Sequence, residues 1–98
     1  MILDELHAVI LDRKLHPREG SYVSSLLTKG RDEILKKIGE EAVEVIVAST
    51  GGNKEQVVHE LADLWFHCMV LLPEHGLSHE DIFRELETRF GKQGEHHE

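Results

Sequence analysis

The hydrophobic residues recur at the three- and four-residue spacing of an α-helix along nearly the whole chain, as Leu3, Leu6 and Ile10 do near its start. No window shows the sustained alternation of apolar and polar residues that is typical of a β-strand. Helix-breaking residues divide the pattern into five segments, with breaks at residues 17–20, 30, 51–52 and 73–76. The sequence therefore predicts an all-α fold, a helical bundle of four to five helices forming one domain over residues 1–91.

Several breaks are followed by a residue suited to begin the next helix. Ser21 and Asn53 are favourable N-cap residues, and Ser78 is followed by Asp81 in the first turn of the last helix. After Gly91 the segment KQGEHHE offers no apolar residue to bury. Residues 92–98 are therefore predicted to form a disordered tail, and its two histidines are not expected to bind metal.

The third and fourth helices are apolar on most sides. Residues 42–48 (AVEVIVA) contain one polar residue, Glu44, and residues 61–72 (LADLWFHCMVLL) contain only Asp63 and His67. A helix that is apolar on most sides is normally buried on most sides, so Glu44 and Asp63 are expected to lie against protein. An unpaired carboxylate there costs on the order of several kcal/mol, so something must compensate it.

Each of these helices also gathers its acidic residues into one stripe, because successive residues are rotated by about 100°. The stripe on the third helix consists of Glu40, Glu41 and Glu44, and that on the fourth consists of Glu60 and Asp63. If the stripes face each other, four or five carboxylates converge and repel one another unless cations neutralise them. The basic residues are too few to do so, because residues 40–63 hold six acids and one base, Lys54.

Carboxylate oxygens of this kind suit Mg²⁺ or Mn²⁺, whereas zinc prefers nitrogen or sulfur ligands. The alternative is an ordinary solvated helix face, which Gln56 and Glu74 would extend along the fourth helix. The apolar surroundings of Glu44 and Asp63 favour the metal site over that alternative. A di-iron carboxylate site is disfavoured because neither acidic motif contains the Glu-x-x-His pair that such bundles use.

Composition narrows the class of protein. The 98 residues include 11 Lys and Arg against 19 Asp and Glu, for a net charge of −8. This balance argues against binding to nucleic acid or to an anionic membrane. The longest apolar run is far below the length of about 20 residues that spans a bilayer, and the single cysteine cannot form an internal disulfide. The chain does not start with a basic secretion signal, so a cytoplasmic location is expected.

The acidic stripes lie within two longer segments, SYVSSLLTKGRDEILKKIGEEAVEVIVAS and HELADLWFHCMVLLPEHGLSHEDIFRELETR. From about residue 18 to residue 90, the sequence resembles the phosphoribosyl-ATP pyrophosphohydrolases of histidine biosynthesis, within the all-α NTP pyrophosphatase (MazG-like) superfamily. The superfamily pattern EExxE and ExxD is present as Glu40-Glu41-x-x-Glu44 and Glu60-x-x-Asp63. Two small departures are Val23 and Phe66, which stand where a threonine and often a tyrosine are expected.

This resemblance implies a magnesium-dependent homodimer that hydrolyses phosphoribosyl-ATP between its α and β phosphates, yielding phosphoribosyl-AMP and pyrophosphate. It implies the metal ligands Glu41, Glu44, Glu60 and Asp63, and catalytic roles for Glu40, Glu41 and Glu44. Glu40 is either a further ligand or the group that orients or deprotonates the attacking water. The SY pair of the motif, Ser21 and Tyr22, is implied to contact the substrate.

Spacing adds two further candidates to this site. Lys37 lies one turn before Glu40 on the same stripe, as a phosphate contact or as an ordinary ion-pair partner of Glu40 or Glu41. His67 lies one turn beyond Asp63, as a substrate contact, a partner of Asp63 or a core histidine. Five more basic residues could collect phosphate groups or be ordinary surface charges: Arg13, Lys14, Arg18, Lys29 and Arg31.

Two other functions stay open at this point. A housecleaning pyrophosphatase of the same superfamily would remove unwanted (d)NTPs, although the SY and GEEAxE segments argue against it. A helical dimer used only for interaction would show no response to magnesium.

Overall fold

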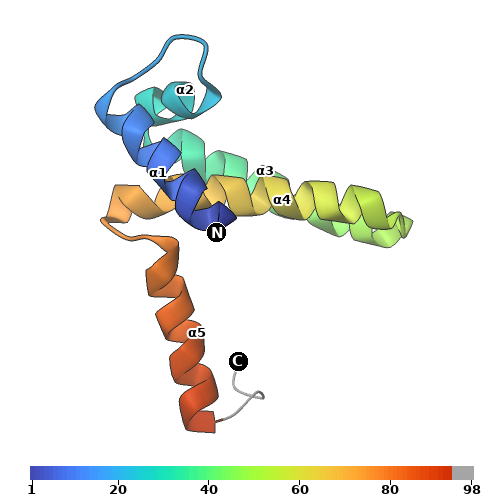
Figure 1. Cartoon of the computed structure of the whole chain (residues 1–98). Helices are drawn as coiled ribbons and strands as arrows, with labels where there is room; N and C mark the ends of the chain where they lie inside the picture. Colours follow the sequence, from blue (N-terminus) through green and yellow to red (C-terminus); the bar gives the residue numbers. More distant parts are fainter. Residues whose placement is uncertain (94–98) are drawn as a thin grey trace.

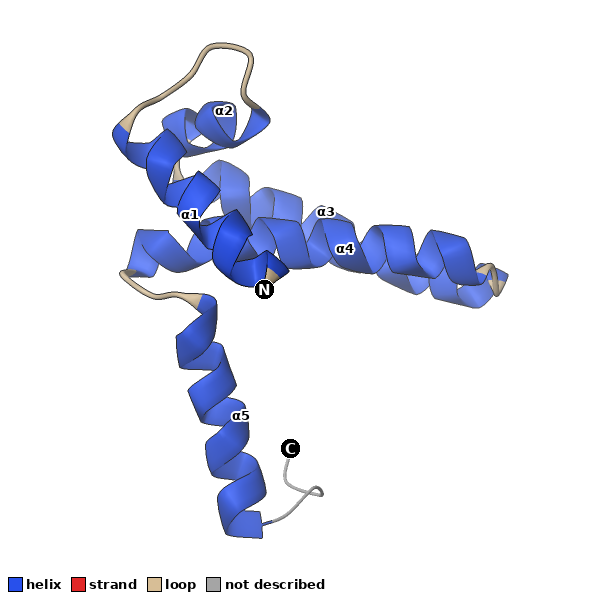
Figure 2. Cartoon of the chain, in the orientation of Figure 1, coloured by secondary structure: helices blue, strands red, loops and turns tan. Residues whose placement is uncertain are grey.

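The computed structural model describes residues 1–93, and these residues form helices without a β-strand, which confirms the predicted all-α class. The helices are α1 (Ile2–Leu15), α2 (Tyr22–Lys29), α3 (Arg31–Gly51), α4 (Lys54–Leu71) and α5 (His79–Gln93), with a short 3₁₀ helix, η1 (Leu72–His75), after α4 (Figure 2).

The helix boundaries follow the predicted caps. The Ser21 hydroxyl accepts a hydrogen bond of 3.1 Å from the Ser24 amide at the start of α2. The Asn53 side chain accepts one of 3.0 Å from the Gln56 amide at the start of α4. Between α2 and α3 the chain turns at Gly30 with φ at 101°, a conformation that essentially only glycine adopts without strain.

Helix α5 begins with a reciprocal cap and ends later than predicted. The Ser78 amide donates to the Asp81 carboxylate at 2.9 Å, and the Ser78 hydroxyl accepts from the Glu80 amide at 3.2 Å. The helix then continues two residues past Gly91, to Gln93. The rest of the predicted tail, residues 94–98, lies outside the described residues.

Helices α3 and α4 form a long antiparallel hairpin, against which the other helices are arranged (Figure 1). Helix α1 crosses α4, and α2 lies against α3 near the start of the hairpin. The buried core lies where these four helices meet, and it consists of Ile10, Val23, Leu26, Ile34, Met69 and Val70. The core therefore holds the open end of the hairpin, where α3 begins and α4 ends.

The rest of the hairpin exposes apolar side chains. Exposed residues occur at helical spacing on each long helix: Val43, Ile46 and Val47 on α3, Val58, Leu61 and Trp65 on α4, and Ile82, Leu86 and Phe90 on α5. Helix α5 projects away from the hairpin (Figure 1). The radius of gyration is 15.2 Å, whereas a compact domain of 100 residues has about 13 Å. No helix in the described part of the chain has the length and apolar character needed to cross a membrane.

A polar contact joins α5 to α1 at the base of this projection. His79 is buried, and its Nε2 lies 2.7 Å from the Asp4 carboxylate. The hydrogen bond from His79, and to a lesser extent the chain terminus, holds the pKa of Asp4 below its ordinary value of 3.8. The ionised form of Asp4 is therefore favoured by folding, so this contact stabilises the docking of α5 at neutral pH.

We expect the substitution Asp4→Asn to lower the melting temperature at pH 7, because it removes the carboxylate that accepts from His79. The stabilisation by Asp4 is present above pH 3.8 and is lost as the pH falls through the lowered pKa of this group. The difference between wild type and variant should therefore shrink below about pH 4. Circular dichroism melts across this range measure it, with Glu5→Gln as the control. A difference that stays constant with pH would contradict the assignment.

Candidate active site between α3 and α4

Three carboxylates of the predicted acidic stripes meet between the two long helices. Glu41 comes from α3, and Glu60 and Asp63 come from α4. Each offers one oxygen atom, and these oxygens all lie within 4.8 Å of one another. Glu60 is only 8% exposed, and the other two are half-buried. The condition left open by the sequence, that the stripes of α3 and α4 face each other, is met for these three residues.

Two neighbours on α4 hold the carboxylates of that helix in place. The Gln56 amide nitrogen donates to Glu60 Oε2 at 2.7 Å, and His59 Nε2 lies 3.5 Å from Asp63 Oδ2. We did not assign His59 to the site from the sequence, although its i,i+4 spacing from Asp63 is the signal that could have placed it there. Gln56 is uncharged, so its hydrogen bond to Glu60 does not offset the negative charge of the cluster.

The concentration of negative charge affects the pKa of Glu41. Burial raises the pKa of Glu41 above its ordinary value of 4.5, and the nearby carboxylates Asp63 and Glu60 raise it further. His67 and Lys37 act in the opposite direction without cancelling these effects. The folded chain therefore brings together negative charges that favour a proton or a cation at this position.

The donor set fits a hard divalent cation. The cluster offers carboxylate oxygens only, without a cysteine or histidine among the three residues. Such ligands match the preferences of Mg²⁺ and Mn²⁺, and structural zinc sites use nitrogen and sulfur instead. Glu41, Glu60 and Asp63 are thus the residues of the described chain that could hold Mg²⁺.

The other two carboxylates of the EExxE motif lie outside this cluster. Glu40 is exposed and forms an ion pair of 3.4 Å with Lys37. This is the ion pair that the sequence left open as the alternative to a phosphate contact for Lys37. Glu44 is exposed as well, so the expectation that it lies against protein is wrong for the single chain. The reason is that the apolar residues beside it, Val43 and Val47, are themselves exposed.

An aromatic group adjoins the carboxylates on the side of α2. The Tyr22 hydroxyl lies 2.8 Å from His67 Nε2, and His67 Nδ1 lies 2.7 Å from the backbone oxygen of Asp63. That backbone oxygen only accepts, so Nδ1 carries the hydrogen, and in the neutral imidazole Nε2 then accepts from Tyr22. The Tyr22 ring also stacks on Phe66, with ring centroids 6.0 Å apart.

Nearby charged groups, including those of the cluster, also affect the pKa values of Tyr22 and Lys37. Burial raises the pKa of the Tyr22 hydroxyl, and the nearby carboxylates of Glu41 and Asp63 act in the same direction, so this hydroxyl keeps its proton. The pKa of Lys37 is raised by Tyr22 and by its pairing with Glu40, so the amine stays charged. The structure thus brings Lys37, Tyr22 and His67 to the carboxylates, whereas Ser21 lies one residue away as the cap of α2.

Known proteins resemble this chain over nearly its whole length. The family model described as phosphoribosyl-ATP pyrophosphohydrolase matches residues 3–90. This chain belongs to that family. A phosphoribosyl-ATP pyrophosphatase of Geobacter sulfurreducens is 52% identical over 93 residues, which cover 95% of this chain and 86% of the relative. The enzyme of the same name from Geotalea daltonii is 50% identical, with 95% of this chain and 88% of the relative covered.

A longer relative contains the same family region. The histidine biosynthesis bifunctional protein HisIE of Caldanaerobacter subterraneus is 50% identical over 91 residues, which cover 93% of this chain and 44% of the relative. The similarity to the phosphoribosyl-ATP pyrophosphohydrolase family therefore spans α1 to α5 and includes every carboxylate of the cluster.

The raised pKa of Glu41 leads to a test of the cation site. Ionisation of Glu41 opposes folding, so the wild type should lose stability relative to Glu41→Gln as the pH rises through this raised pKa. At pH 7 with a chelator, the variant should melt at a higher temperature than the wild type. Adding Mg²⁺ should raise the melting temperature of the wild type and have little effect on the variant, since a ligand stabilises the state that binds it.

The matched control is Glu87→Gln, which removes an exposed carboxylate from α5. This variant should respond to Mg²⁺ as the wild type does, in melts followed by circular dichroism. An equal response of Glu41→Gln and wild type would remove Glu41 from the cation site.

Proposed function

We propose that this chain is a magnesium-dependent phosphoribosyl-ATP pyrophosphohydrolase. It hydrolyses the bond between the α and β phosphates of phosphoribosyl-ATP, which yields phosphoribosyl-AMP and pyrophosphate in the second step of histidine biosynthesis. The observation that carries this proposal is the meeting of Glu41, Glu60 and Asp63 between α3 and α4, in a chain that belongs to the family of that name.

The negative charge of the cluster requires a cation before a triphosphate can approach. Held by Glu41, Glu60 and Asp63, Mg²⁺ would neutralise phosphate charge and make the phosphorus more susceptible to attack. Mn²⁺ could substitute, since it accepts the same oxygen ligands. Glu44 lies one turn beyond Glu41, and side chains at i,i+3 are neighbours on a helix surface, so a change of rotamer would let it serve as a further ligand.

The remaining residues of the site have roles that follow from their chemistry. Lys37 is charged and its ion pair with Glu40 is on the surface, so it can exchange that partner for a phosphate oxygen at little cost. This exchange would leave the Glu40 carboxylate available to orient or deprotonate the attacking water. The water oxygen bonds to phosphorus as the phosphoanhydride bond breaks, and the pyrophosphate product leaves with its oxygens charged.

Tyr22 and His67 are proposed to contact the substrate beside the phosphates. The hydrogen bond between them fixes the direction of the Tyr22 ring, which remains 49% exposed and therefore accessible. Ser21 is proposed to act at the same side through its position next to Tyr22. We also propose a cytoplasmic location. The chain has one cysteine and so cannot form an internal disulfide, a bond that is typical of secreted proteins and rare in the cytoplasm.

Hydrolysis of phosphoribosyl-ATP, followed as pyrophosphate release with Mg²⁺ and with a chelator, tests this function. We expect activity only with the metal, and a loss in kcat/KM of at least about 100-fold for Asp63→Asn, because even residues around metal ligands cost 10- to 100-fold. Glu87→Gln is again the control. Faster turnover of any dNTP in a panel would favour the housecleaning alternative, and no activity with any nucleotide would favour an interaction protein.

We further propose that the enzyme is a homodimer, which buries the exposed apolar residues of α3, α4 and α5. These residues include Ile46, which is 63% exposed, and Trp65, which is 60% exposed. Their helical spacing places them on one side of each helix, and monomeric proteins rarely expose large apolar patches. A second copy of the chain is the occupant that the projecting α5 favours, since α5 has few contacts of its own beyond α1.

The dimer is tested by the substitution Ile46→Glu and light scattering after gel filtration. The wild type should have twice the mass of the 11.2 kDa chain, and the variant should shift toward the monomer because a buried charge disfavours association. Leu15→Glu is the matched control, because Leu15 is 75% exposed but lies at the end of α1, outside the proposed interface. A monomeric wild type would contradict the proposal.

A further inference from the structure

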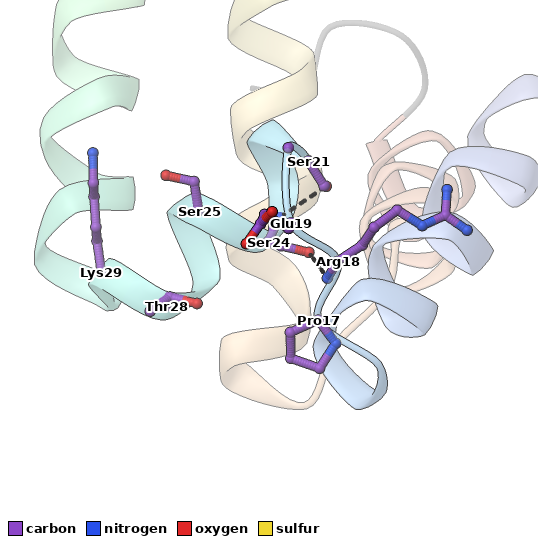
Figure 3. A pocket seen from close by; sticks show the side chains of 9 residues that line it. Pro17, Arg18, Glu19, Ser21, Ser24, Ser25, Thr28 and Lys29 are labelled. Atoms are coloured by element: carbon purple, nitrogen blue, oxygen red, sulfur yellow. Dashed lines mark hydrogen bonds between the residues drawn. The ribbon is translucent and has the colours of Figure 1, made fainter.

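A cavity of about 400 Å³ lies between the segment 17–21 and α2 (Figure 3). Its volume is within the range of about 300–1,000 Å³ that is typical of small-molecule sites. The side chains that line it include two cations, Arg18 and Lys29, and one acid, Glu19. Unlike the negative cluster, this cavity therefore has a positive balance of charge.

Partners distinguish these two cations from the other three basic residues that the sequence suggested for collecting phosphate groups. Arg13 pairs with Asp12 at 2.7 Å, and Lys14 pairs with Glu74 at 3.6 Å. Arg31 donates to the backbone oxygen of Glu74 at 3.3 Å. Within residues 1–93, by contrast, the side chains of Arg18 and Lys29 form neither an ion pair nor a hydrogen bond.

Hydroxyl groups of α2 lie between the cations. The buried Ser24 hydroxyl accepts from the Arg18 amide at 2.9 Å, which fixes the segment against the helix. Ser25 and Thr28 also line the cavity, and in the described chain their hydroxyls have no hydrogen-bond partner. Figure 3 shows Ser25 and Lys29 on one flank of α2, with Arg18 extending from the other side. Cations with free hydroxyl donors are the groups that recognise phosphate oxygens.

A chain of contacts connects the cavity to the carboxylate cluster. Ser21 lines it, and the next residue, Tyr22, bonds to His67, which in turn bonds to the backbone of Asp63 in the carboxylate cluster. The proposed cation site and this cavity are thus connected through α2. Phosphoribosyl-ATP has two anionic ends, a triphosphate and the phosphomonoester of its phosphoribosyl group, and the purine and two riboses separate them.

We propose that this cavity binds the phosphomonoester of the phosphoribosyl group, with Arg18 and Lys29 as its cations and Ser25 and Thr28 as hydroxyl donors. The proposal rests on the function proposed above and adds the basis of its specificity. An ordinary nucleoside triphosphate lacks this phosphomonoester, so the cavity favours phosphoribosyl-ATP over ATP. The triphosphate end is then left to the carboxylate cluster.

Kinetics with phosphoribosyl-ATP as the substrate and ATP as an inhibitor test the cavity. Arg18→Gln and Lys29→Met should each lower kcat/KM for phosphoribosyl-ATP about tenfold, mainly through KM, which corresponds to the loss of one charge-assisted contact. ATP lacks the phosphomonoester, so its inhibition constant should change much less than the KM of phosphoribosyl-ATP. Lys54→Met is the matched control, because Lys54 is the exposed first residue of α4, at the far end of the hairpin from α2. An equal weakening of ATP inhibition, or no loss with phosphoribosyl-ATP, would overturn the proposal.

A binding measurement separates the cavity from the proposed function. Ribose 5-phosphate, added to the metal-free protein with a chelator, should shift the amide NMR signals of residues 17–29, and ribose alone should not. The Arg18→Gln, Lys29→Met double variant should lose these shifts. A wild type that fails to hydrolyse phosphoribosyl-ATP but shows the shifts would refute the proposed function and keep the phosphomonoester site, whereas absent shifts in an active enzyme would refute the site alone.

Discussion

The close approach of the Glu41, Glu60 and Asp63 carboxylates is an unfavourable interaction that the packing of the helices has to offset. Oxygens of three carboxylates within 4.8 Å of one another repel, and burial of Glu60 strengthens the repulsion by excluding water. The packing of α3 against α4 imposes this arrangement, and the core at the open end of the hairpin holds the two helices together. The apolar core thus offsets the repulsion among the clustered carboxylates. A divalent cation bound there would reduce this repulsion.

The size of the chain explains why the core and the site are separate. A chain of 98 residues has few apolar residues to bury, and here they are concentrated around α1, α2 and the adjoining ends of the hairpin. The carboxylates lie in the middle of the hairpin, and the apolar residues of the outer hairpin and α5 are exposed, where we propose that a second copy covers them. Dimerisation and the metal site are therefore proposed for neighbouring parts of the same two helices.

Acidic and basic side chains gather at two separate places in this chain. The net charge of −8 predicts a protein that repels extended polyanions such as nucleic acid. The three clustered carboxylates form a proposed cation site, and Arg18 and Lys29 line a cavity beside α2. A single net charge averages over these two sites and describes neither of them.

The sequence by itself determined the helices, their caps and the acidic stripes, because periodicity and capping depend on residues within about four positions of one another. It also placed Glu41, Glu60 and Asp63 on two stripes that meet if the helices face each other, together with Glu40 and Glu44. Only the tertiary structure decided that Glu44 is exposed, because burial depends on which other helix covers each face. The contact between Tyr22 and His67 joins residues 45 positions apart, and that between Asp4 and His79 joins residues 75 apart. Such pairings depend on the angles at which helices cross, and local sequence patterns do not specify those angles.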